Sequence, residues 1–390
     1  MTRAFTLLAL LALAASGCAS AVALDRAVLA YDTTTADSVS KQLLLNIARA
    51  RHNEPMHFTA ISNIAATYRL NMAAGLGPAA TGDLGSRLVP SLGVAVEESP
   101  TISIAPMQGE EFTQRLLTPF SEERFTLLLR QGYDVDALLR LLGAEVRLGR
   151  ADAPDVQVHS NRPSDADGYR LFRRFVAHLS SIQDRHALFV DALNLQHVWT
   201  VPATEVTPES FLATYHDFSL SPLHDDYSVS KRVSGRVVIT NYNPATLGNA
   251  ERVLLNEEAS LASMNDVLVD IRAGYPGGEW PIHGFLRLRS FHEVLTFVAR
   301  GMVEEPEFDV PPDPRTPQIA ENPAHTLEVV EAASLPPGVR LSVDYDGRQY
   351  AVRPQSGYAW NQKAFSLLYQ LFQMSVSAVA PAGPTLAIVK

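Results

Sequence analysis

The chain has 390 residues, enough for two or three domains of ordinary size, and 46% of them are hydrophobic against 19% charged. This composition excludes a disordered chain and is not that of an integral membrane protein. The net charge of −10, with no Lys/Arg-dense stretch, argues against the basic surface that a nucleic-acid partner requires.

The first predicted element is a secretion signal. Met1, Thr2 and Arg3 give a positive start, and twelve uncharged residues follow, "AFTLLALLALAA" (4–15). This length is typical of the apolar region of a signal peptide and too short to cross a bilayer, which takes about 20 residues. We therefore predict a signal peptide over 1–17.

The end of this signal, "LAASGCAS" (13–20), contains Cys18, the only cysteine of the chain. The small residues before Cys18 resemble a bacterial lipobox, although Ala15 stands where Leu is usual. The alternative is an A-x-A site that signal peptidase would cut after Ala21. The lipobox is favoured because no polar stretch separates the apolar run from Ser-Gly-Cys. We therefore predict Cys18 as the lipidation site.

The first half of the mature chain reads as an N-terminal α+β domain, 18–148. Capping and periodicity predict a helix over 35–53, ended by Pro55, then a β-leaning stretch, a Gly/Pro/Ser-rich loop and two short strands. Three helices follow, the second of them capped by Ser121. The β-leaning stretch covers 56–73, the loop 75–93, the strands 93–99 and 101–107, and the helices 108–118, 122–132 and 134–146.

A polar stretch, 149–167, is the predicted linker to a C-terminal α+β domain, 168–390. Its expected helices are 168–183, a short one from Thr207, 245–263, one after the capping box "SFHE" (290–293), and 360–376; its expected strands are 186–193, 196–203, 236–243 and 384–390. Residues 304–324, with six prolines and six acids, are expected to be a solvated loop. Residues 339–354 predict a hairpin around Asp346-Gly347.

The irregular alternation of these elements predicts the α+β class, with short antiparallel sheets packed with helices and a C-terminal β-hairpin plus helix. The chain has 28 arginines and only 4 lysines. We interpret this bias as a property of the genome's base composition.

Three stretches resemble a largely uncharacterised family of proteobacterial outer-membrane lipoproteins. They are "QLLLNIARARHNEPMHF" (42–58), "SPTISIAPMQGEEFTQRLLTP" (99–119) and "YDGRQYAV…QKAFSLLYQLF" (345–372). Met107 replaces the usual Leu, and the third block is loose. The resemblance implies a lipidated envelope protein and brings no catalytic residues. Ala19, rather than Asp, follows Cys18, and enterobacterial sorting then implies transfer to the outer membrane, facing the periplasm.

Two Ser-x-x-Lys motifs, Ser38/Lys41 and Ser228/Lys231, have the spacing with which serine acylases place a nucleophile beside a base. The partner motifs Lys-Thr-Gly and Ser-x-Asn are missing. We therefore predict no catalytic residues, and a serine hydrolase is only the weaker alternative.

Two further groups are candidate binding residues. His216, His224 and Asp225 lie in "YHDFSLSPLHDDY" (215–227), where His and carboxylate ligands would suit a divalent cation, but a polar loop explains them as well. Asn46, Arg49 and Arg51 are candidate residues for an anionic partner, although such residues also satisfy a helix end. We predict no metal site and no cofactor.

The expected function is therefore that of a lipid-anchored, periplasm-facing outer-membrane lipoprotein, held in the membrane through its N-terminal lipid and binding an envelope protein in an assembly or scaffolding role. The expectation is of a non-enzymatic protein with no nucleic-acid partner. A ligand-binding lipoprotein of an export system is the alternative, and it would require a dry, aromatic-lined pocket.

Overall fold

The computed structural model describes residues 2–79, 87–150, 153–154, 156–207, 218–335, 337–354 and 359–376; side chains are described from residue 25 onward, except in 62–101. The described residues fall into two compact units. The first contains the residues up to Ser38 and His57–Phe112, and the second contains Val39–Met56 and Thr113–Val376. Helix α1 (Thr2–Arg51) contributes to both, and it contains the helix predicted over 35–53.

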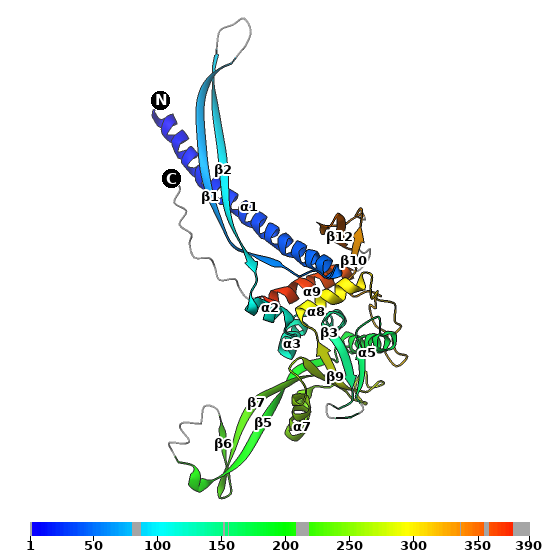
Figure 1. The fold of residues 1–390 in the computed structure, drawn as a ribbon. Coiled ribbons are helices and arrows are strands. Elements are labelled where there is room, and N and C mark those ends of the chain that lie inside the picture. Colours follow the sequence, from blue (N-terminus) through cyan, green and yellow to red (C-terminus); the bar gives the residue numbers. More distant parts are fainter. Residues whose placement is uncertain are drawn as a thin grey trace. The chain divides into compact units, whose positions relative to one another are not determined.

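The first unit contains a long antiparallel hairpin, β1 (Phe58–Ala79) and β2 (Arg87–Met107) (Figure 1). The pairing runs from Phe58–Met107 to Ala79–Arg87, with an irregularity between Ile61 and Asn63. The β-leaning stretch 56–73 is thus confirmed, whereas the two short strands form one and most of the expected loop 75–93 belongs to strands. Gly and Pro are tolerated here because both strands are edges of a two-stranded sheet.

The second unit is built on a seven-strand sheet of order β4-β3-β9-β8-β7-β5, with β6 also paired to β7 (Figure 1). The strands are β3 (Gly143–Leu148), β4 (Gln157–Ser160), β5 (Phe189–Pro202), β6 (Ser219–Leu223), β7 (Asp226–Thr240), β8 (Asp266–Ile271) and β9 (Ile282–Leu288). The linker expected over 149–167 contains β4, which pairs with β3. The strands expected at 186–193 and 196–203 form the single strand β5.

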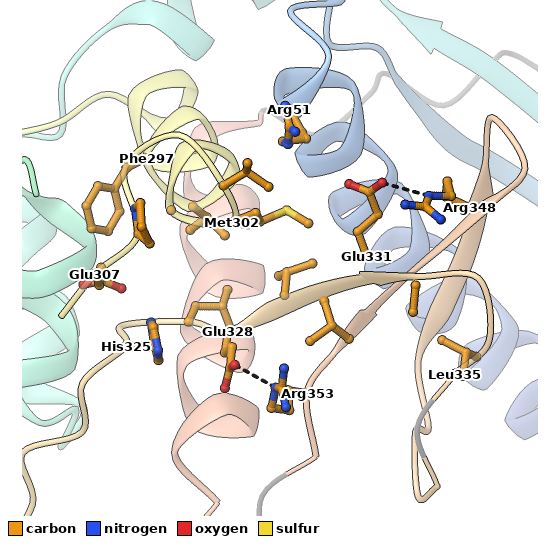
Figure 2. Close-up of a pocket in the computed structure, with 18 of the residues that line it drawn as sticks. Arg51, Phe297, Met302, Glu307, His325, Glu328, Glu331, Leu335, Arg348 and Arg353 are labelled. Atoms are coloured by element: carbon orange, nitrogen blue, oxygen red, sulfur yellow. Dashed lines mark hydrogen bonds and ion pairs between the residues drawn. The ribbon is translucent and has the colours of Figure 1, made fainter. Parts of the chain in front are cut away.

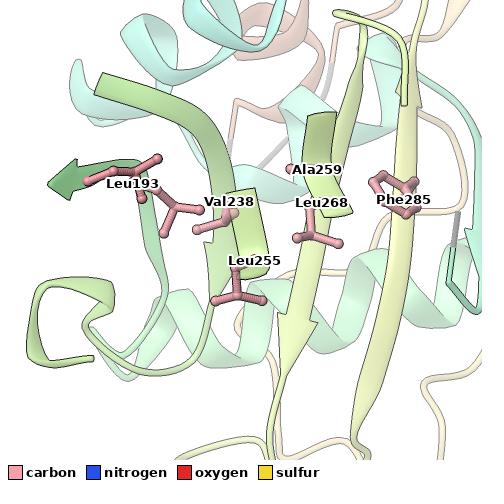
Figure 3. Close-up of a cluster of buried hydrophobic side chains, with 7 residues drawn as sticks. Leu193, Val238, Leu255, Ala259, Leu268 and Phe285 are labelled. Carbon is pink, nitrogen blue, oxygen red and sulfur yellow. The ribbon is translucent and has the colours of Figure 1, made fainter. Parts of the chain in front are cut away.

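The sheet is antiparallel except between β7 and β8. Parallel neighbours need a crossover, which 3₁₀-helix η2 (Pro244–Thr246) and α7 (Asn249–Ser260) supply. Helix α7 packs on the sheet through a buried apolar cluster (Figure 3), which consists of Leu193, Leu195, Val238, Leu255, Ala259, Leu268 and Phe285. All six residues of β8 are buried, as expected of a strand covered on both faces.

A charged network also joins α7 to the sheet. The His283 ring of β9 lies 3.0 Å from the Asp270 carboxylate through Nδ1 and 2.8 Å from the Glu258 carboxylate of α7 through Nε2. The hydrogen bond to Asp270 raises the pKa of His283, burial opposes this, and Glu258 raises it further, to about 9. His283 is therefore an imidazolium that links two strands and α7 at neutral pH.

The other described helices confirm the predicted ones closely: α2 (Glu110–Leu117), α3 (Glu122–Arg130), α4 (Val135–Leu142), α5 (Ala166–Asp184), α8 (Phe291–Gly301) and α9 (Trp360–Ser375). Ser121 caps α3, and Ser290 with Glu293 forms the predicted capping box of α8. The helix expected over 134–146 is wrong only in its last four residues, 143–146, because the chain turns into β3 at Gly143. A Cβ on Gly143 would lie 2.6 Å from the Leu139 carbonyl oxygen. The short helix expected from Thr207 falls almost wholly on 208–217, outside the described residues.

The Pro-rich segment 304–324 contains no helix or strand, as expected of a loop, and the expected solvation holds in part: Pro311, Pro314 and Arg315 are exposed, whereas Glu307 and Val310 are buried. Val310 is 2% exposed. The buried guanidinium of Arg140 donates to the Pro323 carbonyl at 2.6 Å and to the Asn322 side chain at 2.7 Å. Arg173 donates to the carbonyls of Pro323 and Ala324 at 2.8 and 2.9 Å. Two buried arginines therefore hold residues 322–324 of this segment by hydrogen bonds.

A small sheet of order β10-β12-β11 completes the second unit, with β10 (Val329–Ala332), β11 (Ser342–Tyr345) and β12 (Arg348–Val352). Asp346 and Gly347 both have positive φ, 51° and 70°, as a tight two-residue hairpin turn requires. The predicted C-terminal hairpin and helix are confirmed, and so is the α+β class; the strand predicted over 384–390 lies outside the described residues.

Candidate functional site

The residues proposed for lipid and metal do not form a described site. Cys18 lies in α1, in the part whose side chains are not described. His216 falls outside the described residues, while His224 and Asp225 form the turn between β6 and β7. Within the ranges that the structure describes, no three His, Cys, Asp or Glu side chains gather in a way that could hold a metal ion.

The second Ser-x-x-Lys motif lies in a strand. Ser228 and Lys231 are three residues apart in β7, and residues at odd spacing in a strand point to opposite faces of the sheet. The Lys231 ammonium instead lies 5.0 Å from the centre of the Phe218 ring. This geometry does not place a base beside the Ser228 hydroxyl. Ser38 and Lys41 are both in α1.

The three candidates for an anionic partner have different environments. Asn46 is fully buried, and its amide donates to the Gln42 carbonyl at 2.9 Å. Arg49 donates to the Asn46 side chain at 3.4 Å. Of the three, only Arg51 lines the cavity described next, so the structure does not bring them together in one site.

This cavity, which we call the α8–β10 groove, has a volume of about 780 Å³ and lies in the second unit (Figure 2). Its walls come from the end of α8 and the residues after it, from the segment that contains β10, from β12 and from the end of α1. The lining residues are Arg51, Phe297, Val298, Gly301, Met302, Val303, Pro306, Glu307, His325, Leu327–Ala332, Ser334, Leu335, Arg348 and Arg353.

The α8 wall is apolar and firmly held. The capping box fixes the start of the helix, and the buried Arg289 guanidinium lies 4.0 Å from the centre of the Phe297 ring. Val298 is buried, whereas Val303 is 56% exposed at the end of this wall. The wall therefore offers apolar surface that continues from the core to solvent.

The opposite wall is the edge of a sheet. Six consecutive residues, Leu327–Ala332, line the groove. A strand that borders a cavity with one face contributes every second residue, because successive side chains alternate. Six in a row therefore indicate that the backbone edge of β10 faces the groove, in agreement with its place at the end of the sheet order.

The ladder between β10 and β12 shows which backbone groups face outward. The Arg353 amide donates to the Glu328 carbonyl at 2.9 Å. The buried Asn361 side chain replaces the reciprocal bond: it accepts from the Glu328 amide at 3.1 Å and donates to the Arg353 carbonyl at 3.0 Å. Since bonded and non-bonded pairs alternate in an antiparallel ladder, the N–H and C=O groups of Val329 and Glu331 point away from β12.

Charged side chains of the groove are mostly paired with one another. Arg348 lies 3.1 Å from Glu331, and Arg353 lies 2.7 Å from Glu328 (Figure 2). Burial, followed by the charge of Glu331, raises the pKa of Tyr350 to about 12, and the Tyr350 hydroxyl lies 2.8 Å from His52 Nε2. This contact fixes the end of α1 on the small sheet.

Arg51 is the exception. Its Nε is buried and has no hydrogen-bond partner among the described residues. Its Nη1 is 3.9 Å from the half-exposed Glu304 carboxylate, too far for a hydrogen bond. Arg51 therefore keeps donor capacity on the groove.

The α8–β10 groove thus offers an apolar wall, unpaired backbone groups and one incompletely paired cation, which together suit the binding of a ligand. Of its lining residues, only Arg51 is a candidate binding residue from the sequence. The only local signal of the groove is "VVEA" (329–332), too short to be separated from a loop.

Comparisons with protein-family models, with curated proteins and with solved structures gave no significant match to this chain. The resemblance to proteobacterial outer-membrane lipoproteins therefore stays a prediction. In the part of the chain that the structure describes, no helix has both the length and the apolar character needed to span a membrane.

Proposed function

We propose that this chain is a lipid-anchored lipoprotein of the bacterial outer membrane that faces the periplasm and acts, without catalysis, by binding another protein. The observation that carries the anchor is Cys18, a single cysteine at the end of a signal-like apolar run. A mature bacterial lipoprotein carries three acyl chains, and several chains hold a protein on a membrane far more firmly than one.

The interaction role is supported by the α8–β10 groove. Only one of its lining residues, Phe297, is aromatic, whereas six carry a formal charge. An apolar small molecule favours a lining with few charges. A polypeptide can use both the charged side chains and the backbone edge.

A second cavity, of about 620 Å³, favours the alternative of a ligand-binding lipoprotein. It lies beside α9, and Phe365 and Tyr369 are among its lining residues. Aromatic side chains of this kind suit an apolar ligand. The two functions differ in their occupant: a polypeptide in the first, a lipid-like or aromatic molecule in the second.

The anchor is tested by growing Gram-negative cells that express the full chain with an alkyne fatty acid, and by detecting the label on the purified protein. We expect label on wild type and none on Cys18→Ala. Ala21→Leu is the matched control, because it disrupts the A-x-A site and leaves the lipobox intact. It should keep the label and be processed normally. Unlabelled wild type, or accumulation of the Ala21→Leu precursor, would refute the lipoprotein.

A further inference from the structure

We infer that the α8–β10 groove binds an extended segment of a partner protein as an additional strand on β10, with alternate apolar residues against α8 and a carboxylate at Arg51. This inference deepens the proposed function and rests on its interaction role. It names the chemistry of the partner: an extended peptide with apolar residues at every second position and at least one acidic residue.

The backbone of β10 sets the conformation of the occupant. Val329 and Glu331 direct two N–H donors and two C=O acceptors into the groove, and none of the described residues hydrogen-bonds to them. Donors and acceptors spaced two residues apart along a strand are matched by another strand, which bonds to alternate residues. A compact ligand satisfies one or two of these groups, whereas an extended peptide satisfies all four.

The side walls set the sequence pattern. A strand added to β10 lies between that edge and the end of α8, so one of its faces meets Val298, Met302 and Val303. Since side chains alternate along the added strand, every second residue should be apolar. The residues between them point away from this wall and are free to vary.

Arg51 determines which charge the bound peptide should carry. Its Nε has no partner and its Nη1 has only a distant carboxylate, while the other two arginines of the groove are paired with Glu331 and Glu328. The Arg51 side chain is 22% exposed, so a carboxylate on the peptide can pair with it, and guanidinium–carboxylate pairs are among the strongest charge-assisted hydrogen bonds. An acidic peptide is therefore preferred over a neutral or basic one.

A second copy of this chain fits less well. Paired strands lie about 4.8 Å apart, and each β10 edge has the end of its own α8 alongside it. Two such edges would bring two helix walls into the space that one strand needs. A free segment of a partner carries no such wall.

The test uses the full chain in detergent and a phage-displayed library of short linear peptides as the probe. We expect enrichment of peptides with alternating apolar residues and an acidic residue. Their binding should slow hydrogen exchange at the Val329 and Glu331 amides. Absence of any enriched pattern overturns the inference. So does slow exchange of these two amides in the free chain, because the edge would then be covered already.

A matched pair of variants separates backbone pairing from side-chain contacts. Glu331→Ala and Glu331→Pro both remove the carboxylate that pairs with Arg348, but only Pro removes the outward N–H. We expect Glu331→Ala to bind a selected peptide within about 3-fold of wild type, and Glu331→Pro to bind it at least about 10-fold more weakly. Equal binding by the two variants, with equal thermal stability, overturns strand addition.

The charge is tested on the same peptide. Arg51→Gln should weaken an acidic peptide about 10-fold and leave its Glu-to-Gln counterpart unchanged; an equal effect on both peptides overturns the role of Arg51. Failure of peptide binding can be distinguished from failure of the lipid anchor. Fatty-acid label on Cys18 without peptide binding overturns only this inference, whereas peptide binding without label overturns only the lipoprotein.

Discussion

The imidazolium of His283 should make the stability of the second unit depend on pH above neutrality. His283→Gln keeps a polar side chain of similar size and removes the charge. The folded-state pKa of His283 is raised from 6.5 to about 9. Its contribution is therefore fully present below about 6.5, the pKa of the unfolded chain, and is lost as the pH rises through about 9.

The size of this stability change follows from the change in the pKa of His283 and from the exposure of its side chain. A rise of about 2.5 pH units corresponds to at most about 3 kcal/mol. Because 35% of the His283 side chain is exposed, solvent screening reduces this to about 1–2 kcal/mol. Between pH 6.5 and 9.5, wild type should lose that much more unfolding free energy than His283→Gln.

Urea unfolding followed by tryptophan fluorescence measures this difference, because Trp280 and Trp360 are buried in the second unit. His292→Gln, which removes a histidine without an ion pair among the described residues, should follow the wild-type pH dependence. If wild type and His283→Gln lose stability in parallel over this range, the imidazolium does not stabilise the contact of α7 with the sheet.

Two further predictions concern buried contacts. Arg236 is 8% exposed; its Nε lies 2.9 Å from both Glu122 oxygens, and the rest of its guanidinium binds four carbonyls. Glu122→Leu should lower the unfolding free energy, measured in urea, by about 3–5 kcal/mol, because it leaves the buried charge of Arg236 unpaired. Adding Arg236→Met should recover most of this loss. A double variant that is no more stable than Glu122→Leu would contradict the prediction. Gly284→Ala should cost about 1–3 kcal/mol of unfolding free energy, because the new Cβ would lie 2.1 Å from the Arg147 carbonyl oxygen. Gly301→Ala is the control and should not destabilise the unit, because nothing lies within 4 Å of its Cβ. Equal melting temperatures of the two variants would refute the clash.

The elements that the sequence predicts best have local signals. The capping box of Ser290 and Glu293 and the turn at Asp346-Gly347 are each complete within four residues, so tertiary contacts add little to them. Strands β8 and β9 have no such signal, and no element is predicted from the sequence over their residues. The end of α4 at Gly143 depends on the pairing of β3 with β9, which no window of sequence contains.

The α8–β10 groove was out of reach for the same reason. It combines Arg51 with the end of α8 and with two strands of a small sheet, and these segments meet only in the folded unit. The interpretation of the arginine bias as a property of base composition is incomplete for a different reason. Base composition explains how many arginines there are, but Arg140, Arg173 and Arg289 are buried and donate to one, two and three backbone carbonyls, respectively. A lysine ammonium lacks the fork of donors for this geometry.

The anchoring of the Pro-rich segment has a consequence for proteolysis. Proteases cut where the chain can leave the fold locally, and long connections without helix or strand are the usual sites. Between α8 and β10, such release would require the carbonyls of residues 323 and 324 to leave two buried guanidinium groups, and Glu307 to leave the Thr326 amide, to which it is bonded at 2.6 Å. Despite its six prolines and six acids, this connection should therefore resist nicking at residues 322–326, directly before β10.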